Sequence, residues 1–96
     1  MKGMNVRVSA NATRDIEGHV EYLKGQSPTV AARFVAAVTE TCDIVAVSPG
    51  VGSVYETASG VRVGLRVSRV NGFPNHLVFY RERAGVLEIV RVLHGA

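Results

Sequence analysis

The spacing of the apolar residues changes near the middle of this chain, and the change limits the possible folds more than any other feature. Up to residue 48 apolar side chains recur every three or four positions, which is the period of a helix. From residue 61 they alternate with polar residues, which is the period of a strand with one buried face. A chain of 96 residues with this order predicts a single α+β domain, residues 1–96, in which helices pack on a sheet.

The first half predicts a short strand followed by two helices. Val6–Val8 forms the strand, and Ser9 is placed to cap the helix after it, because its hydroxyl can accept a free amide hydrogen. This helix ends at Gly25-Gln26, and Ser27-Pro28 begins the next one with a hydroxyl cap and a proline in the first turn. Pro49-Gly50 ends the second helix, and the short connection predicts an antiparallel hairpin. The apolar stripe of the first helix is Ala12, Ile16, Val20 and Leu23, and that of the second is Ala31, Phe34, Val35, Val38, Cys42 and Val45.

The second half predicts three strands. A glycine-bearing loop from Pro49 to Gly60 leads to the first of them, residues 61–67, and residues 71–75 form the next turn. The other two strands, Leu77–Arg83 and Val86–Leu93, are joined by a tight hairpin at Ala84-Gly85. We therefore expect an α+β fold with an N-terminal strand and an antiparallel two-helix hairpin. The hairpin packs on one face of a mainly antiparallel sheet that three C-terminal strands complete.

The last two strands are apolar on both sides. Two short helices can cover only one face of the sheet, so the second face should carry an apolar floor rimmed by arginines. A monomer seldom leaves such a patch exposed without a function, which predicts a partner. By strict alternation one side carries Leu77, Phe79, Leu87, Ile89 and Leu93, and the other carries Val78, Tyr80, Val90 and Val92.

The positive charge of the chain lies in its second half. Residues 1–48 carry five basic and five acidic groups, whereas residues 49–96 carry six arginines and three glutamates. This excess favours an acidic partner, either nucleic acid or an acidic protein segment, although ordinary solvating charge is an equally open reading. The single cysteine fits a reducing cytoplasm, and we expect no secretory signal and no membrane-spanning segment.

Several short pieces of the sequence, taken in order, resemble the toxins of the RelE/ParE superfamily, nearer the ParE branch. The pieces are Tyr22-Leu23, Ser27-Pro28, Phe34, Pro49-Gly50-Val51-Gly52, Gly60-Val61-Arg62, His76 to Arg81 and Ile89 to Ala96. The resemblance implies the toxin of a two-component cassette, held inactive by a cognate antitoxin that is ParD-like or similar. In such families the antitoxin wraps the toxin with a flexible C-terminal segment, which agrees with the uncovered face. We expect no cofactor.

The superfamily divides by mechanism: RelE-like members cut mRNA on the ribosome, and ParE-like members poison DNA gyrase. By this resemblance, Arg62 falls where a nuclease lysine would lie, Gly64 falls at the next such position, and His76 falls near a strand arginine. The chain stops at Ala96, about where a C-terminal arginine would come, whereas Arg91–Ala96 matches the ParE-type ending. We therefore predict no catalytic residue. The scattered carboxylates predict no metal site.

The leading hypothesis is a cytoplasmic ParE-like toxin that inhibits DNA gyrase without sequence-specific DNA binding of its own. The alternatives are a ribosome-dependent mRNA endoribonuclease and a degenerate, non-toxic binding module. The alternative role for the arginines is to form salt bridges to Glu56, Glu82 and Glu88. The alternative role for His94 is to end the last strand, and that for Tyr80 is to pack under the antitoxin. The candidate residues for target or antitoxin binding are Arg62, Arg66, Tyr80, Arg81, Arg91 and His94.

Overall fold

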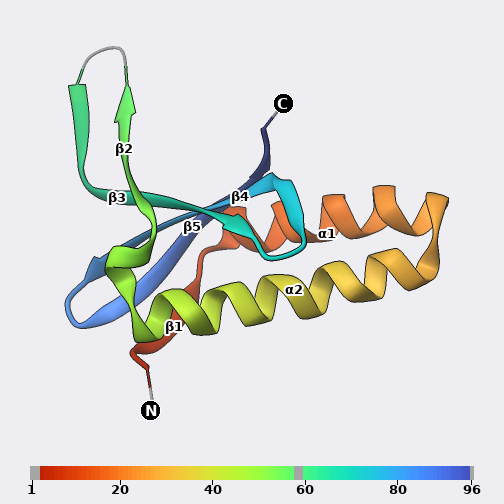
Figure 1. Ribbon diagram of the computed structural model, residues 1–96, viewed down its shortest axis with the longest axis horizontal. Helices are drawn as coiled ribbons and strands as arrows, with labels where there is room; N and C mark the ends of the chain where they lie inside the picture. Colours follow the sequence, from red (N-terminus) through yellow and green to blue (C-terminus); the bar gives the residue numbers. More distant parts are fainter. Residues whose placement is uncertain (1–2, 58–59, 96) are drawn as a thin grey trace.

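The computed structural model describes residues 3–57 and 60–95, without the side chains of residues 57 and 60–63. Two antiparallel helices lie together on one side of a twisted sheet, as predicted (Figure 1). The elements are β1 (Asn5–Val8), α1 (Ala10–Gln26), α2 (Pro28–Val47), the 3-10 helix η1 (Pro49–Val51), β2 (Ser53–Thr57), β3 (Gly60–Val70), β4 (Phe73–Arg83) and β5 (Val86–His94).

Two serines set the ends of the helices. The Ser9 hydroxyl accepts a hydrogen bond from the Ala12 amide at 3.0 Å and caps α1. Ser27 both ends α1, by donating its amide hydrogen to the Leu23 carbonyl at 2.7 Å, and caps α2, by accepting from the Val30 amide at 3.3 Å. A single extended residue thus separates the helices, which holds them antiparallel and in contact.

The sheet has the strand order β1-β5-β4-β3-β2. β1 pairs with β5 in parallel, and the other pairs are antiparallel. The segment predicted as a loop from Pro49 to Gly60 contains β2, so that prediction was wrong over Ser53–Thr57. β4 also begins at Phe73, because only Asn71 and Gly72 form the turn before it. Gly72 has φ of +80°, the left-handed conformation that a tight turn needs.

A β-bulge decides which strand residues enter the core. Phe79 is opposite Arg91, but Tyr80 is opposite Ile89, so β5 has one extra residue at this point. The bulge reverses the alternation of β5, and the faces predicted by strict alternation were therefore wrong beyond it. The strand residues buried against the helices are Val70, Val78, Tyr80, Leu87, Ile89 and Val92. On α2, Val35 is 44% exposed and does not belong to the predicted apolar face.

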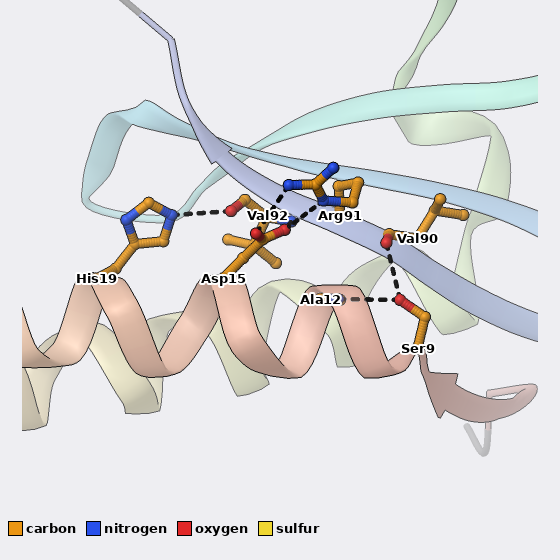
Figure 2. Close-up of polar contacts among 7 residues, drawn as sticks. All are labelled: Ser9, Ala12, Asp15, His19, Val90, Arg91 and Val92. Carbon is orange, nitrogen blue, oxygen red and sulfur yellow. Dashed lines mark hydrogen bonds and ion pairs between the residues drawn. The ribbon is translucent and has the colours of Figure 1, made fainter.

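Helix α1 completes the outer edge of β5, which β1 covers only from Val86 to Ile89. Beyond that point the Ser9 hydroxyl donates to the Val90 carbonyl at 2.8 Å (Figure 2). Asp15 Oδ2 accepts from the Val92 amide at 3.0 Å, and His19 Nε2 lies 2.8 Å from the Val92 carbonyl oxygen. Side chains spaced along one helix face thus continue the hydrogen bonding of the missing strand.

An ion pair reinforces this junction. Arg91 Nε and Nη2 donate to the two carboxylate oxygens of Asp15 at 2.7 and 3.0 Å (Figure 2). The hydrogen bond from Arg91 is the main cause that lowers the pKa of Asp15 below its ordinary value of 3.8, against the opposing effect of burial. Arg91, a candidate for partner binding, therefore has a structural role, and its partner is Asp15 rather than any of the three predicted glutamates.

Replacing Asp15 with alanine should lower the free energy of unfolding by about 1–3 kcal/mol at neutral pH, because the Val92 amide and Arg91 lose their acceptor. Because the pKa of Asp15 is lowered in the folded state, its stabilisation is present above pH 3.8 and is lost as the pH falls through the folded-state pKa. Urea denaturation at several pH values should show the variant approaching the wild type in acid. Glu17→Ala, on the exposed side of the same helix, is the control, and an equal loss in both variants would contradict the assignment.

Candidate functional site

The face of the sheet away from the helices carries an apolar surface, which we call the open face. It is formed by Tyr55, Val67, Leu77, Phe79 and Leu93. Val67 lies opposite Phe79, and Leu77 lies opposite Leu93, so these side chains are cross-strand neighbours. The rings of Tyr55 and Phe79 meet edge to face with centroids 5.2 Å apart. All five are partly exposed, whereas Val78 and Tyr80, their neighbours along β4, are buried.

A groove runs along the margin of the open face beside β3. β2 pairs with β3 only as far as Ser53, opposite Val67, so the edge of β3 is uncovered beyond that point. The groove has a volume of about 570 Å³ and exposes Arg69 beside the open-face residues Val67 and Leu77; Val51, Gly52 and Ser53 form its other wall. A partner bound to the open face would therefore contact both its apolar side chains and the positive charge of Arg69.

The arginines around this face differ in how far they are already engaged. Arg81 pairs with Glu88 at 2.8 Å, so the predicted alternative of a salt bridge to a glutamate is confirmed for this residue. Arg69 is exposed, and its side chain forms no hydrogen bond or ion pair within the described part of the chain. Arg69 thus provides the available positive charge beside the groove. Sequence reasoning passed over it, because nothing in the alternation distinguishes it from the other arginines.

Tyr80 lies in the core, where its hydroxyl organises the connection between α2 and β2. The hydroxyl donates to the Pro49 carbonyl at 2.7 Å and accepts from the Gly52 amide at 2.9 Å. Burial is the main cause that raises the pKa of this phenol above 10.0. Gly52 has no room for a side chain, since an added Cβ would lie 2.7 Å from the Val67 carbonyl oxygen. The sequence had left open whether Phe79 or Tyr80 faces outward. Phe79 does, so Tyr80, a candidate for partner contact, is a structural residue.

Arg66 lies on the same side of the sheet as Tyr80, its register partner. Its Nη1 donates to the Gly52 carbonyl at 2.8 Å, so the guanidinium supports the η1–β2 connection and does not rim the open face. The side chain of Arg62 lies outside the described residues. Among the candidate arginines whose side chains are described, only Arg81 lies beside the apolar surface of the open face without also contacting the core or α1.

His94 lies opposite His76 on β4, and the two rings have centroids 4.9 Å apart. The ring of His19, on α1, lies at the same distance from the ring of His76. Burial, followed by the charges of His19 and His94, lowers the pKa of His76 below 6.5. Sequence reasoning treated the three histidines separately, because residues 19, 76 and 94 approach one another only through the strand register and the docking of α1.

Neither a metal site nor a membrane-spanning helix is found among the described residues. In residues 3–57 and 60–95, no three or more histidine, cysteine, aspartate or glutamate side chains are grouped so that they could hold a metal ion. Across the same ranges, neither helix combines the length and the apolar character that crossing a membrane requires.

Comparison with known proteins gives a consistent picture. Residues 6–96 match the model of a family described as the ParE toxin of the type II toxin–antitoxin system parDE. The chromosomal ParDE system from P. aeruginosa contains a chain of similar fold, with a TM-score of 0.79, 14% identity and 97% of each chain covered. The toxin–antitoxin complex RelBE2 from Mycobacterium tuberculosis contains another, with a TM-score of 0.64, 22% identity and coverage of 98% of this chain and 93% of that one. At these identities the two structures show the fold alone. No curated protein sequence matches the chain.

Replacing Tyr80 with phenylalanine should lower the free energy of unfolding by about 1–3 kcal/mol, because the Gly52 amide and the Pro49 carbonyl lose a buried partner. Thermal or urea denaturation measures the loss. Tyr22→Phe removes the same atom from a side chain that is 68% exposed, and it should change stability by less than about 0.5 kcal/mol. Similar stabilities for the two variants would contradict a structural role for the Tyr80 hydroxyl.

Proposed function

We propose, from the premise that this chain belongs to the ParE toxin family of type II toxin–antitoxin systems, that it inhibits DNA gyrase and that a cognate antitoxin neutralises it. The family match over residues 6–96 is the observation that carries the proposal. On this proposal the toxin acts in the cytoplasm, where gyrase acts on DNA. The chain inhibits by binding and carries out no reaction of its own.

The open face supports the antitoxin part of the proposal. Val67, Leu77, Phe79 and Leu93 leave apolar surface partly exposed on one side of the sheet, and removing such surface from water favours association. The guanidinium of Arg69, which has no partner among the described residues, stands at its margin. An extended antitoxin segment with apolar side chains and a carboxylate near Arg69 would match both features.

The chemistry of the sheet favours gyrase over the ribosome as the target. Cleavage of RNA at a ribose 2′-hydroxyl needs a group that removes the proton and cations that stabilise the phosphorane. The resemblance placed nuclease cations near residues 62, 64 and 76, and two of these positions hold Gly64 and His76. His76 has a lowered pKa, so its imidazole is neutral at pH 7 and supplies no fixed positive charge.

The purified chain should inhibit the supercoiling of relaxed plasmid by gyrase, and prior mixing with the antitoxin should restore supercoiling. The antitoxin to use is the product of the neighbouring open reading frame, expected to be small and acidic. No inhibition at clear stoichiometric excess would refute the gyrase target. Primer extension on translating ribosomes provides the second arm: site-specific cuts would identify a RelE-like nuclease instead. An absence of any growth defect on expression without antitoxin would identify a degenerate binding module.

Replacing Phe79 with alanine should weaken antitoxin binding at least ~30-fold, the effect of losing a central aromatic contact of about 2 kcal/mol. Isothermal titration calorimetry measures the affinity, and circular dichroism of the free variant checks the fold. Val35→Ala, which shortens an apolar side chain that is 44% exposed on α2, is the matched control and should change the affinity less than ~3-fold. An affinity for the Phe79 variant equal to that of the control would place the antitoxin elsewhere.

A further inference from the structure

Three arginines surround one glutamate on the open-face side of the sheet, at the end where β4 turns into β5 (Figure 1). Glu88 on β5 lies opposite Arg7 on β1 and opposite Arg81 on β4. Arg83 lies two residues further along β4, on the same face as Arg81. A cavity of about 190 Å³ opens beside them, partly lined by Arg7, Arg83 and Glu88. We call Arg7, Arg81, Arg83 and Glu88 the arginine corner.

The arginine corner carries more positive charge than it can neutralise. Its one carboxylate already pairs with Arg81, whose Nε lies 2.8 Å from Glu88 Oε1. Arg7 and Arg83 are exposed, and neither side chain forms a hydrogen bond or ion pair within the described residues. Three positive groups and one negative group leave a surplus of positive charge that attracts an anion. A guanidinium can hold a carboxylate through two parallel hydrogen bonds, which makes a carboxylate a suitable ligand.

The arginine corner continues the open face. Along β4, Arg81 and Arg83 follow Phe79 at alternate positions, so these three side chains lie on the same side of the sheet. Tyr80, which lies between Phe79 and Arg81 in the chain, is buried on the other side. A partner that covers Phe79 can therefore reach the arginine corner along one face of the sheet.

Arg69 and the arginine corner lie at the two ends of the open face. Arg69 is opposite Leu77, and Arg83 follows Leu77 by six residues on β4. Six residues of a strand span roughly 20 Å, and an extended segment lying along β4 would rise by nearly the same distance per residue. Two of its side chains six positions apart would therefore reach both regions, and both would point to the same side because successive side chains alternate.

The surface between the two charged regions decides the class of partner. It is apolar, and Phe79, whose ring contacts that of Tyr55, lies within it. A protein segment can bury apolar side chains there and place a carboxylate at each end. Binding to a phosphate backbone relies on many cations, and it would make no use of this apolar surface.

On the basis of the function proposed above, we propose that the arginine corner binds an acidic side chain of the antitoxin segment that covers the open face. The segment carries two carboxylates about six residues apart, one for Arg69 and one for Arg7 and Arg83, with apolar side chains between them. A segment with a different spacing can satisfy only one of the two regions. The spacing thus contributes to which antitoxin this chain accepts.

The test is the affinity of the full chain for the product of the neighbouring open reading frame, measured by isothermal titration calorimetry. The double variant Arg7→Gln/Arg83→Gln should weaken binding at least ~5-fold, about the effect of two exposed ion pairs. The control, Arg14→Gln/Arg33→Gln, removes the same charge from exposed positions on α1 and α2. It should change the affinity less than ~2-fold, because distant charges are screened by salt. Thermal denaturation checks that each variant is folded.

The variant Glu88→Gln should have an effect that misfolding cannot imitate. It removes the negative charge of the arginine corner and frees Arg81, so binding should become roughly 2- to 5-fold tighter, the range of one exposed ion pair. Equal affinities of the two double variants would overturn this role of the arginine corner, and so would a Glu88 variant that binds no more tightly than the wild type. In both cases the wild type still binds the antitoxin, and the proposed function stands. No binding by the wild type would instead refute the antitoxin part of the proposed function, and this role with it.

Discussion

The hydrogen bonding of the outer edge of β5 is the constraint on which the rest of this structure depends. A strand edge buried beneath a helix must satisfy its amide and carbonyl groups, and β1 reaches only as far as Ile89. Ser9, the N-cap of α1, and Asp15 and His19, four residues apart on α1, supply the missing partners. Their spacing along the helix forces α1 to lie beside β5 (Figure 2). Because Ser27 holds α2 antiparallel to α1, both helices then cover the same face, and the other face is left open.

This constraint explains what could be predicted from the sequence and what could not. The helices, their caps and their pairing follow from local spacing and from Ser9, Ser27 and Pro28, because helix hydrogen bonds join residues close in sequence. The faces of β5 depend on the bulge between Phe79 and Tyr80, which arises from pairing between strands and leaves no local mark. β2 was missed because glycines flank its five residues, although valine, tyrosine and threonine within it are typical of strands.

The structure shows which of the arginines counted in the sequence already form contacts within the chain. Six arginines against three glutamates in the second half favoured an acidic partner, with nucleic acid as one possibility. Arg66 instead supports Gly52, Arg81 pairs with Glu88, and Arg91 pairs with Asp15. Of the other arginines of this half whose side chains are described, Arg69 at the edge of the mostly apolar open face and Arg83 at the end of β4 remain exposed. A surface of this kind is typical of a protein partner, since binding to a phosphate backbone relies on many unpaired cations.

His19 belongs both to the junction of α1 with β5 and to a group of packed aromatic rings. A helix that only needed to satisfy the Val92 carbonyl could use serine, threonine or asparagine, since each donates a hydrogen bond. Histidine also brings a ring, which meets the rings of Phe34 and His76 edge to face with centroids 5.8 and 4.9 Å apart. The residue that docks α1 on β5 thus also packs against one ring of α2 and one ring of β4. The two roles of His19 are therefore not alternatives, because the same ring serves both.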